Sequence, residues 1–121
     1  MKFTRESHSA VTVRHVEKGE IRVGDDTITD DVLLFREHVT HWSAADPQNI
    51  TETDLQALID EKPEIIIFGT GWTTRLPPRE LVFALARKGI GFECMDTPAA
   101  CRTFNILVSE DRDVAALLLL S

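Results

Sequence analysis

The feature that most constrains the fold of this chain is a run of four apolar residues that is followed at once by two glycines. Residues 65–68 read IIIF, and Gly69-Thr70-Gly71 comes directly after them. β-branched and aromatic residues favour strands, and an unbroken apolar run is typical of a strand that is covered on both faces. Glycine supplies the backbone freedom for a turn at the end of such a strand. The run therefore predicts a central, buried strand that opens into a glycine-bracketed loop.

Helical and strand patterns alternate along the second half of the chain. In each helical stretch the apolar residues recur at three- and four-residue spacing, and each predicted strand is a short apolar run. Alternation of this kind gives helices packed on a largely parallel sheet, with right-handed crossovers. The predicted elements are helices that begin at Thr51, Pro78 and Thr97, and strands at residues 65–68, 91–95 and 114–119.

The ends of the predicted helices carry recognisable capping residues. Thr51 and Asp54 match the pattern of a capping box. Thr97-Pro98 reads as an N-cap followed by a proline in the first turn, and Pro78 suits a first helical position. Gly89 is expected to end its helix in the left-handed conformation.

The first third of the chain has a different pattern, with short alternating strands separated by Gly and Asp turns. Such spacing predicts an antiparallel meander. This meander either extends the central sheet or lies over it, and the organisation changes near Asp46-Pro47. We therefore expect one domain over residues 1–121, with a meander in 1–45 and alternating helices and strands in 46–121. The strands are expected at residues 11–16, 21–23, 32–36 and 39–42, with turns at Lys18-Gly19 and Gly24-Asp25-Asp26.

The composition excludes several function classes. The formal net charge is -7 and no cluster of Lys and Arg is present, which disfavours nucleic-acid binding. No apolar run approaches the roughly 20 residues that a transmembrane helix needs. Residues 1–10 are polar and lack the apolar centre of a signal peptide, so a cytoplasmic location is expected. The 2 cysteines are expected to be reduced thiols.

Two strand ends are rich in polar residues and form the candidate site. Ligands bind at the carboxyl ends of strands in open α/β sheets. One such end is Gly69-Thr70-Gly71, with Arg75 further along its loop, and the other is Asp96-Thr97. The helix that follows Thr97 is expected to offer free amides and a positive dipole end to a small anion, with Arg75 or Arg102 neutralising charge.

No cofactor motif supports this site. A dinucleotide fingerprint needs a third glycine at position 74, which is Thr, and the Gly-Lys-Ser/Thr of a phosphate-binding loop is absent. A tight turn, where the backbone passes close to a neighbouring segment, is the favoured explanation of the two glycines, and a ligand site is the alternative.

No catalytic or metal-binding constellation emerges either. Cys101 is the best placed nucleophile, because a helix start lowers the pKa of a thiol. However, Cys101 shares a helix face with Phe104 and Val108, which favours a structural role, and no motif brings a base near it. His38 and His41 lie on opposite faces if their segment is a strand, so no metal site is expected there.

The second half resembles a widespread family of small uncharacterised α/β proteins, which includes the mitochondrial complex I assembly factor 3 and an adipogenesis-associated vertebrate protein. The shared pattern is a strand followed by G-T-G, a helix opened by two prolines, and then M-D-T-x-A-A-C-x-T-F-N. The resemblance implies a three-layer α/β domain, with a mixed, mostly parallel central sheet flanked by helices and an extra antiparallel β-layer from the N-terminal region. The matching positions are Gly69, Thr70, Gly71, Pro78, Asp96, Thr97, Ala100, Cys101, Thr103 and Asn105.

Two functional hypotheses follow. The resemblance and the missing catalytic constellation favour a non-enzymatic accessory domain that binds a protein partner, in a role linked to assembly of a larger complex. The alternative is a protein or enzyme that binds a small molecule or anion at the carboxyl ends of strands 65–68 and 91–95, through Gly69, Thr70, Gly71, Arg75, Asp96, Thr97, Cys101 and Arg102.

Overall fold

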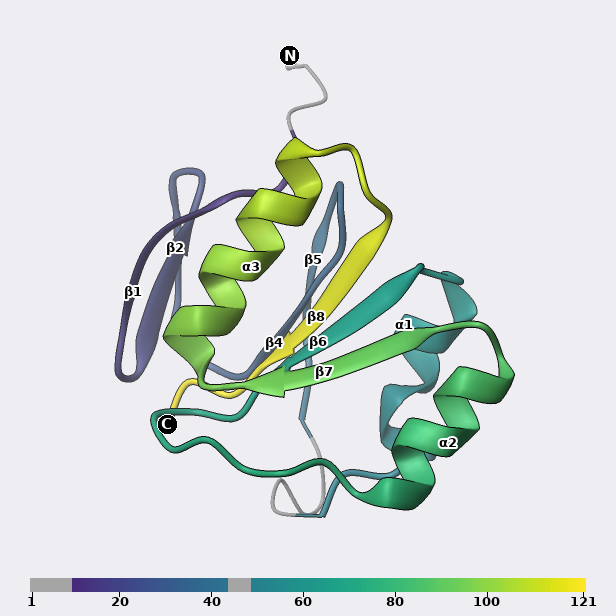
Figure 1. Ribbon diagram of the computed structural model, residues 1–121. Coiled ribbons are helices and arrows are strands. Elements are labelled where there is room, and N and C mark those ends of the chain that lie inside the picture. The colour runs from purple at the N-terminus through teal and green to yellow at the C-terminus, as the bar shows by residue number, and fades with distance from the viewer. Residues whose placement is uncertain (1–9, 44–48) are drawn as a thin grey trace.

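A mixed five-stranded sheet runs through the middle of the molecule (Figure 1), in the strand order β5-β4-β8-β6-β7. The computed structural model describes residues 10–43 and 49–121. Strands β6, β7 and β8 are parallel, and β4 is antiparallel to both of its neighbours. The strands are β4 (Val32–Leu34), β5 (Val39–His41), β6 (Ile65–Gly69), β7 (Gly91–Met95) and β8 (Val114–Leu118).

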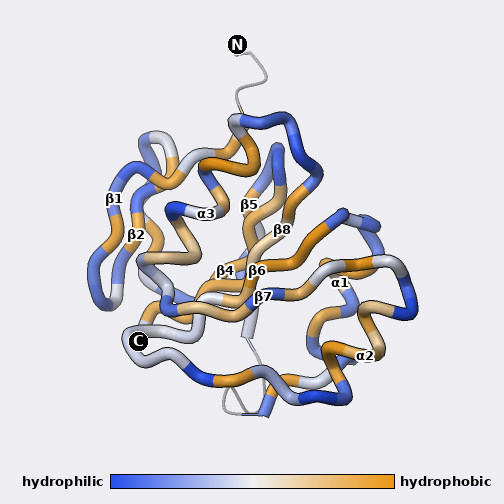
Figure 2. Tube along the Cα trace, viewed as in Figure 1, coloured by the Kyte–Doolittle hydropathy of each residue, from blue (hydrophilic) through white to orange (hydrophobic). Residues whose placement is uncertain are grey.

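Both faces of this sheet are covered, as the apolar run at residues 65–68 predicts. Because side chains alternate across a strand, Ile66 and Phe68 enter the core on one face and Ile67 enters the core on the other. All five residues of β8 are buried. Figure 2 shows the hydrophobic residues gathered along the central strands.

Different elements cover the two faces. On one face, α3 (Thr97–Ser109) packs together with a three-stranded antiparallel sheet of order β1-β2-β3. That sheet consists of β1 (Val13–Glu17), β2 (Glu20–Val23) and β3 (Asp26–Ile28). On the other face lie the 3-10 turn η1 (Thr53–Leu55), α1 (Gln56–Asp60) and α2 (Arg79–Arg87). The expected fold, a mixed sheet flanked by helices with an extra N-terminal β-layer, is confirmed.

Several element ends differ from the expectations. Asp26 begins β3 instead of belonging to the turn, which is formed by Gly24 and Asp25. The Thr51–Asp54 pair is present, since the Thr51 amide donates to Asp54 Oδ2 at 2.9 Å, but the chain forms a 3-10 turn before α1. Pro78 precedes α2 as its N-cap. The change expected at Asp46-Pro47 lies outside the described residues.

Asn105 joins the two elements that share one face of the central sheet. Its side-chain amide donates to the Val13 carbonyl at 2.9 Å, and its Oδ1 accepts from the Val13 amide at 2.9 Å. Val13 lies in β1, at an edge of the three-stranded sheet, beside an irregularity in the pairing with β2. The Asn105 side chain thus takes the place of a neighbouring strand and ties β1 to α3.

Replacing Asn105 by Ala is expected to lower the free energy of unfolding by about 2 kcal/mol, because both backbone groups of Val13 lose their partners. Urea denaturation measures the change. Asn49→Ala is the matched control, because Asn49 is exposed, and it should stay within about 0.5 kcal/mol of the wild type. A loss for Asn105→Ala no larger than that of the control would contradict the assigned role.

Candidate functional site

The three parallel strands end level with one another at the candidate site. In the pairing register Gly69 lies between Met95 of β7 and Leu118 of β8. The segments that follow these residues therefore meet at one edge of the sheet. Figure 1 shows the C-terminal end of the chain beside the loop that leaves β6. The structure thus brings together Gly69-Thr70-Gly71 and Asp96-Thr97, as the sequence predicts.

Thr97 links these segments through hydrogen bonds that are wholly internal. Its side chain is 0% exposed, and its hydroxyl donates to the Leu119 carbonyl at 2.6 Å. The same oxygen accepts from the Gly71 amide at 2.9 Å, and the Thr97 amide donates to the Gly71 carbonyl at 2.7 Å. The Leu119 amide in turn donates to the Gly69 carbonyl at 2.9 Å. These groups bind one another rather than face an open cleft.

The two glycines are explained by close approach of neighbouring atoms. A Cβ on Gly69 would lie 2.9 Å from Leu118 Cδ2 and 3.0 Å from Thr97 Oγ1. Gly71 has a φ of +90°, and a Cβ there would lie 2.5 Å from the Ser121 carbonyl oxygen. Gly71 therefore excludes a side chain, and a side chain at Gly69 would require its neighbours to shift, so packing explains both glycines without any ligand. The loop is held as a tight turn against residues 119–121.

The start of α3 does not have the free amides that we expected. Asp96, and not Thr97, is the N-cap, and its carboxylate accepts from the Ala99 amide at 2.8 Å. The Ala100 amide donates to the Asp96 carbonyl at 2.9 Å, and Pro98 has no N–H. Thr97 cannot cap the helix because its hydroxyl faces the strand ends. The Asp96 carboxylate already complements the helix dipole, so an added anion would meet a like charge.

The two arginines of the predicted site occupy different surroundings. Arg75 Nη2 donates to the Thr70 carbonyl at 3.2 Å, so its guanidinium lies against the glycine loop. Thr70 itself is buried, and its hydroxyl donates to the Thr73 carbonyl at 2.7 Å. Arg102 is exposed on α3. A ligand-binding role for these residues stays a prediction, and a thermal-shift series with phosphate and carboxylates would test it.

Both cysteines lie in apolar surroundings. Cys101 is 3% exposed, and burial raises the pKa of its thiol to about 12, against an opposing effect from the charge of Arg102. Burial raises the pKa of the half-buried Cys94 thiol to about 11. Only a thiolate is a nucleophile. Cys101 therefore has the properties of a structural thiol.

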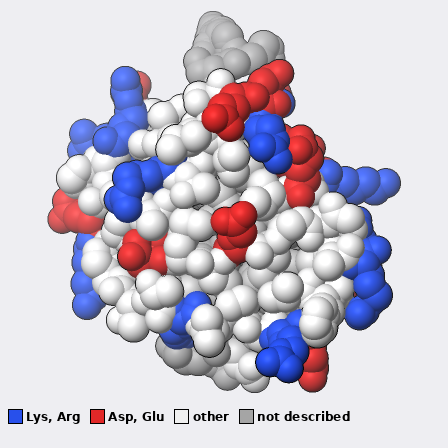
Figure 3. Space-filling model, viewed as in Figure 1, with Lys and Arg blue, Asp and Glu red and all other residues white. Residues whose placement is uncertain are grey.

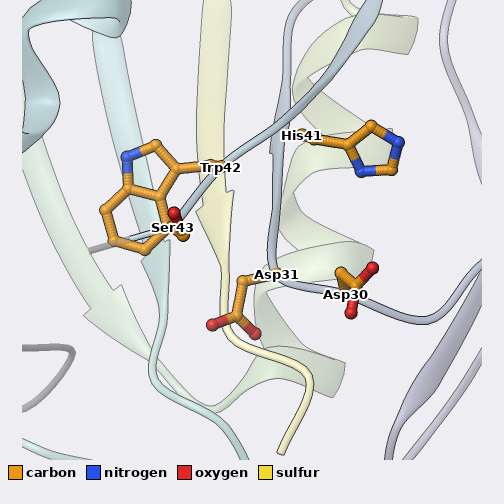
Figure 4. A pocket seen from close by; sticks show the side chains of 5 residues that line it. All are labelled: Asp30, Asp31, His41, Trp42 and Ser43. Atoms are coloured by element: carbon orange, nitrogen blue, oxygen red, sulfur yellow. The ribbon is translucent and has the colours of Figure 1, made fainter. Parts of the chain in front are cut away.

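A separate cavity of about 540 Å³ lies beside the ends of β4 and β5, and sequence reasoning missed it (Figure 4). Of its two acidic side chains, Asp31 is already engaged, because Asp31 Oδ1 accepts from the Leu120 amide at 2.9 Å. Trp42 Nε1 donates to the Asp54 carbonyl at 3.0 Å. The lining side chains are Asp30, Asp31, His41, Trp42 and Ser43. They belong to turns and strand ends that no sequence motif connects.

One group of potential metal ligands occurs within the described ranges. Ligand atoms of His15, Glu17 and Glu20 lie within 4.8 Å of one another on the β1–β2 hairpin. His15 Nε2 and Glu17 Oε1 already share a hydrogen bond of 2.7 Å, and both side chains are exposed. Glu20 joins them across the hairpin turn, so spacing along the sequence could not have revealed the group.

The mixed sheet, its two covered faces and the hydrogen-bonded ends of its parallel strands define a small α/β domain. The chain belongs to the family described as "Protein of unknown function (DUF498/DUF598)", which matches residues 13–119. The resemblance noted in the sequence is thereby confirmed.

Curated relatives extend this assignment. The chain is 36% identical over 74 residues to the "13 kDa major membrane protein" of Francisella tularensis, which covers 61% of this chain and 60% of that protein. It is 33% identical over 118 residues to the bovine "NADH dehydrogenase [ubiquinone] 1 alpha subcomplex assembly factor 3", which covers 95% of this chain and 64% of that protein. The chain thus spans less than two thirds of the length of either relative.

Solved structures have the same fold. A protein from Bordetella parapertussis is 34% identical with a TM-score of 0.87, over 96% of this chain and 100% of that one. A Bordetella pertussis protein, described as a Mth938-like domain, is 32% identical with a TM-score of 0.78, over 99% and 92%. In the part of this chain that the structure describes, none of the helices has the length and apolar character to cross a membrane.

Replacing Thr97 by Val should lower the free energy of unfolding by about 2 kcal/mol, because Val keeps the shape but leaves the Gly71 amide and Leu119 carbonyl without that hydroxyl. Thr97→Ser keeps the hydroxyl and is the matched variant. Thermal and urea unfolding of the two proteins measure the difference. If Val is tolerated better than Ser, packing rather than hydrogen bonding holds the strand ends together.

The folded protein should react slowly with iodoacetamide at pH 8, because thiols with pKa values of about 11 and about 12 are almost entirely protonated at that pH. Labelling followed by mass spectrometry, with and without urea, measures the rate. The urea-unfolded chain is the control and should react at the rate of an ordinary cysteine. If Cys101 in the native protein is modified as fast as in the unfolded chain, its thiol would be reactive enough to act as a nucleophile.

Proposed function

We propose that this chain is a non-enzymatic accessory domain that binds a protein partner during assembly of a larger complex. The observation that carries the proposal is the 95% coverage of this chain by relatives named as an NADH dehydrogenase assembly factor, in cattle and in humans. The part of those proteins that this chain matches is the α/β domain itself. The proposal assigns the assembly role of these relatives to this domain, which makes up 64% of each of them.

The geometry of the candidate site supports this choice over an enzyme. At the carboxyl edge of the sheet, the polar groups of Thr97, Gly71 and Leu119 form hydrogen bonds with one another. Catalysis by a cysteine would require a thiolate, and the raised pKa of Cys101 opposes its formation. An accessory protein needs no such groups, since it acts through its surface.

The surface offers apolar side chains for such contacts. Leu76 is 93% exposed in the loop between β6 and α2, and Phe83 on α2 and Ile106 on α3 are each 56% exposed. Exposed aromatic and large aliphatic side chains provide much of the binding energy at protein interfaces.

A cytoplasmic location is part of the proposal. Two relatives carry names that point to membranes, the Francisella protein and "an outer membrane protein" from Bartonella henselae. Fractionation of cells of the source organism, with a carbonate wash of the membrane pellet, separates the locations. Recovery of the protein in the washed pellet would contradict a cytoplasmic location.

Deletion of the gene should reduce the amount of assembled NADH dehydrogenase complex and leave partial complexes behind. Native gel electrophoresis with an in-gel activity stain measures both. The wild-type gene and a Cys101→Ala variant should each restore assembly, because the proposal assigns no chemistry to that thiol. An unchanged amount of assembled complex would overturn the proposed link to this assembly. If the wild-type gene restores assembly and a folded Cys101→Ala variant does not, the result would indicate an enzyme instead.

A further inference from the structure

The outer surface of α2 combines exposed apolar and basic side chains with one exposed carboxylate, Glu80. Its residues follow one another at helical spacing, since Arg79, Phe83 and Arg87 are four apart and neighbouring turns of a helix place such residues on one face. Leu76 precedes the helix in the loop that leads into it. We call the surface formed by Arg79, Phe83 and Arg87 the α2 stripe.

The inner face of the same helix is fully used by the core. Leu81 and Leu85 are buried against the central sheet, whereas Phe83 is 56% and Leu76 93% exposed. The α2 stripe is thus separate from the residues that hold the helix in place. Changes in it should leave the fold intact.

The charge of this region differs from that of the whole chain. The net charge of the protein is -7, yet between residues 70 and 90 the charged side chains are Arg75, Arg79, Glu80, Arg87 and Lys88. Figure 3 shows basic side chains at both ends of α2, an acidic side chain beside the patch at one end, and uncharged surface between the two ends. Lys88 pairs with Glu52 at 3.3 Å, but within the described residues Arg79 and Arg87 form no ion pair.

We propose that the α2 stripe binds an acidic segment of a protein partner, one that places apolar side chains between its carboxylates; this inference rests on the protein-binding function proposed above. Arg79 and Arg87 are eight residues apart, so they lie about 12 Å apart along the helix axis. A partner carboxylate can meet each guanidinium while an apolar side chain covers Phe83. Arg is well suited to carboxylate recognition because its planar group donates two parallel hydrogen bonds.

A protein segment fits this surface better than a lipid bilayer does. A helix that lies in a membrane interface inserts a broad apolar face, and the apolar face of α2 is already packed on the sheet. A second copy of this chain is also a less suitable partner. Its own net charge of -7 adds long-range repulsion between copies.

Site-specific cross-linking in cells of the source organism tests the inference. The photoreactive residue p-benzoylphenylalanine replaces Phe83, and a second strain carries it at exposed Thr27 on β3 as a comparison. We expect a protein adduct from position 83, with a cross-linked peptide rich in Asp and Glu. Arg79→Glu combined with Arg87→Glu should reduce the adduct at least about tenfold, because each change replaces attraction by repulsion.

The matched control is Arg14→Glu combined with Arg22→Glu. Both residues are exposed on the three-stranded sheet, so the net charge changes equally while the α2 stripe is untouched. The amount of cross-linked adduct should then fall less than about twofold. Circular dichroism checks that both double variants fold. An equal effect of the two pairs would show that net charge alone matters and would overturn the inference.

Other outcomes separate the inference from the proposed function. Adducts from position 27 but none from position 83 would overturn the α2 stripe and leave a protein-binding function standing. Absence of protein adducts at both positions would count against both. Binding of the purified chain to phosphatidylcholine vesicles with phosphatidylserine, lost on Arg79→Glu with Arg87→Glu, would assign the stripe to lipid. A dimer in sedimentation that the same changes dissociate would assign it to a second copy.

Discussion

The hydroxyl of Thr97 holds together three chain segments that are distant in sequence. It accepts a hydrogen bond from the Gly71 amide and donates one to the Leu119 carbonyl. The ends of β6 and β8 are thereby fixed to the first turn of α3. The absence of a side chain at Gly69 and Gly71 makes this approach possible. The place of α3 on the sheet, and with it the packing of the N-terminal sheet, depends on this junction. An α/β sheet usually leaves this edge open for ligands, and here the chain's own segment 119–121 fills it.

The local patterns of the second half were readable from the sequence because they involve near neighbours. Residues 91–95 form a strand with the expected limits, and the Thr51–Asp54 pair forms as the spacing indicated. The wrong assignment of the α3 N-cap concerns distant contacts. Asp96 and Thr97 can both cap a helix, and the choice between them was made by Leu119 and Gly71, which the sequence does not place nearby.

At the candidate site, too, distant contacts decide the outcome and the sequence pattern does not reveal them. The strand ends were correctly expected to meet, since parallel strands direct their carboxyl ends to one edge. That the amide of Thr97 is paired with Gly71 depends on the exact path of both loops. The exposure of Phe83 also depends on which face of α2 packs on the sheet. Residue types predicted a polar site, but only the packing distinguishes a filled junction from a cleft.

The pairing of β4 with β8 has a consequence for how the protein is made on the ribosome. β4 (Val32–Leu34) leaves the ribosome long before its partners Ala116, Leu117 and Leu118. The hydrogen bonds between Val13 and Asn105 likewise join residues that are 92 positions apart. The strands of the first third of the chain therefore lack these packing partners until residues 105–118 have been synthesised, and closing such long loops is slow. Until then their apolar faces are exposed to other chains, and this is the interval in which a chaperone would protect the protein.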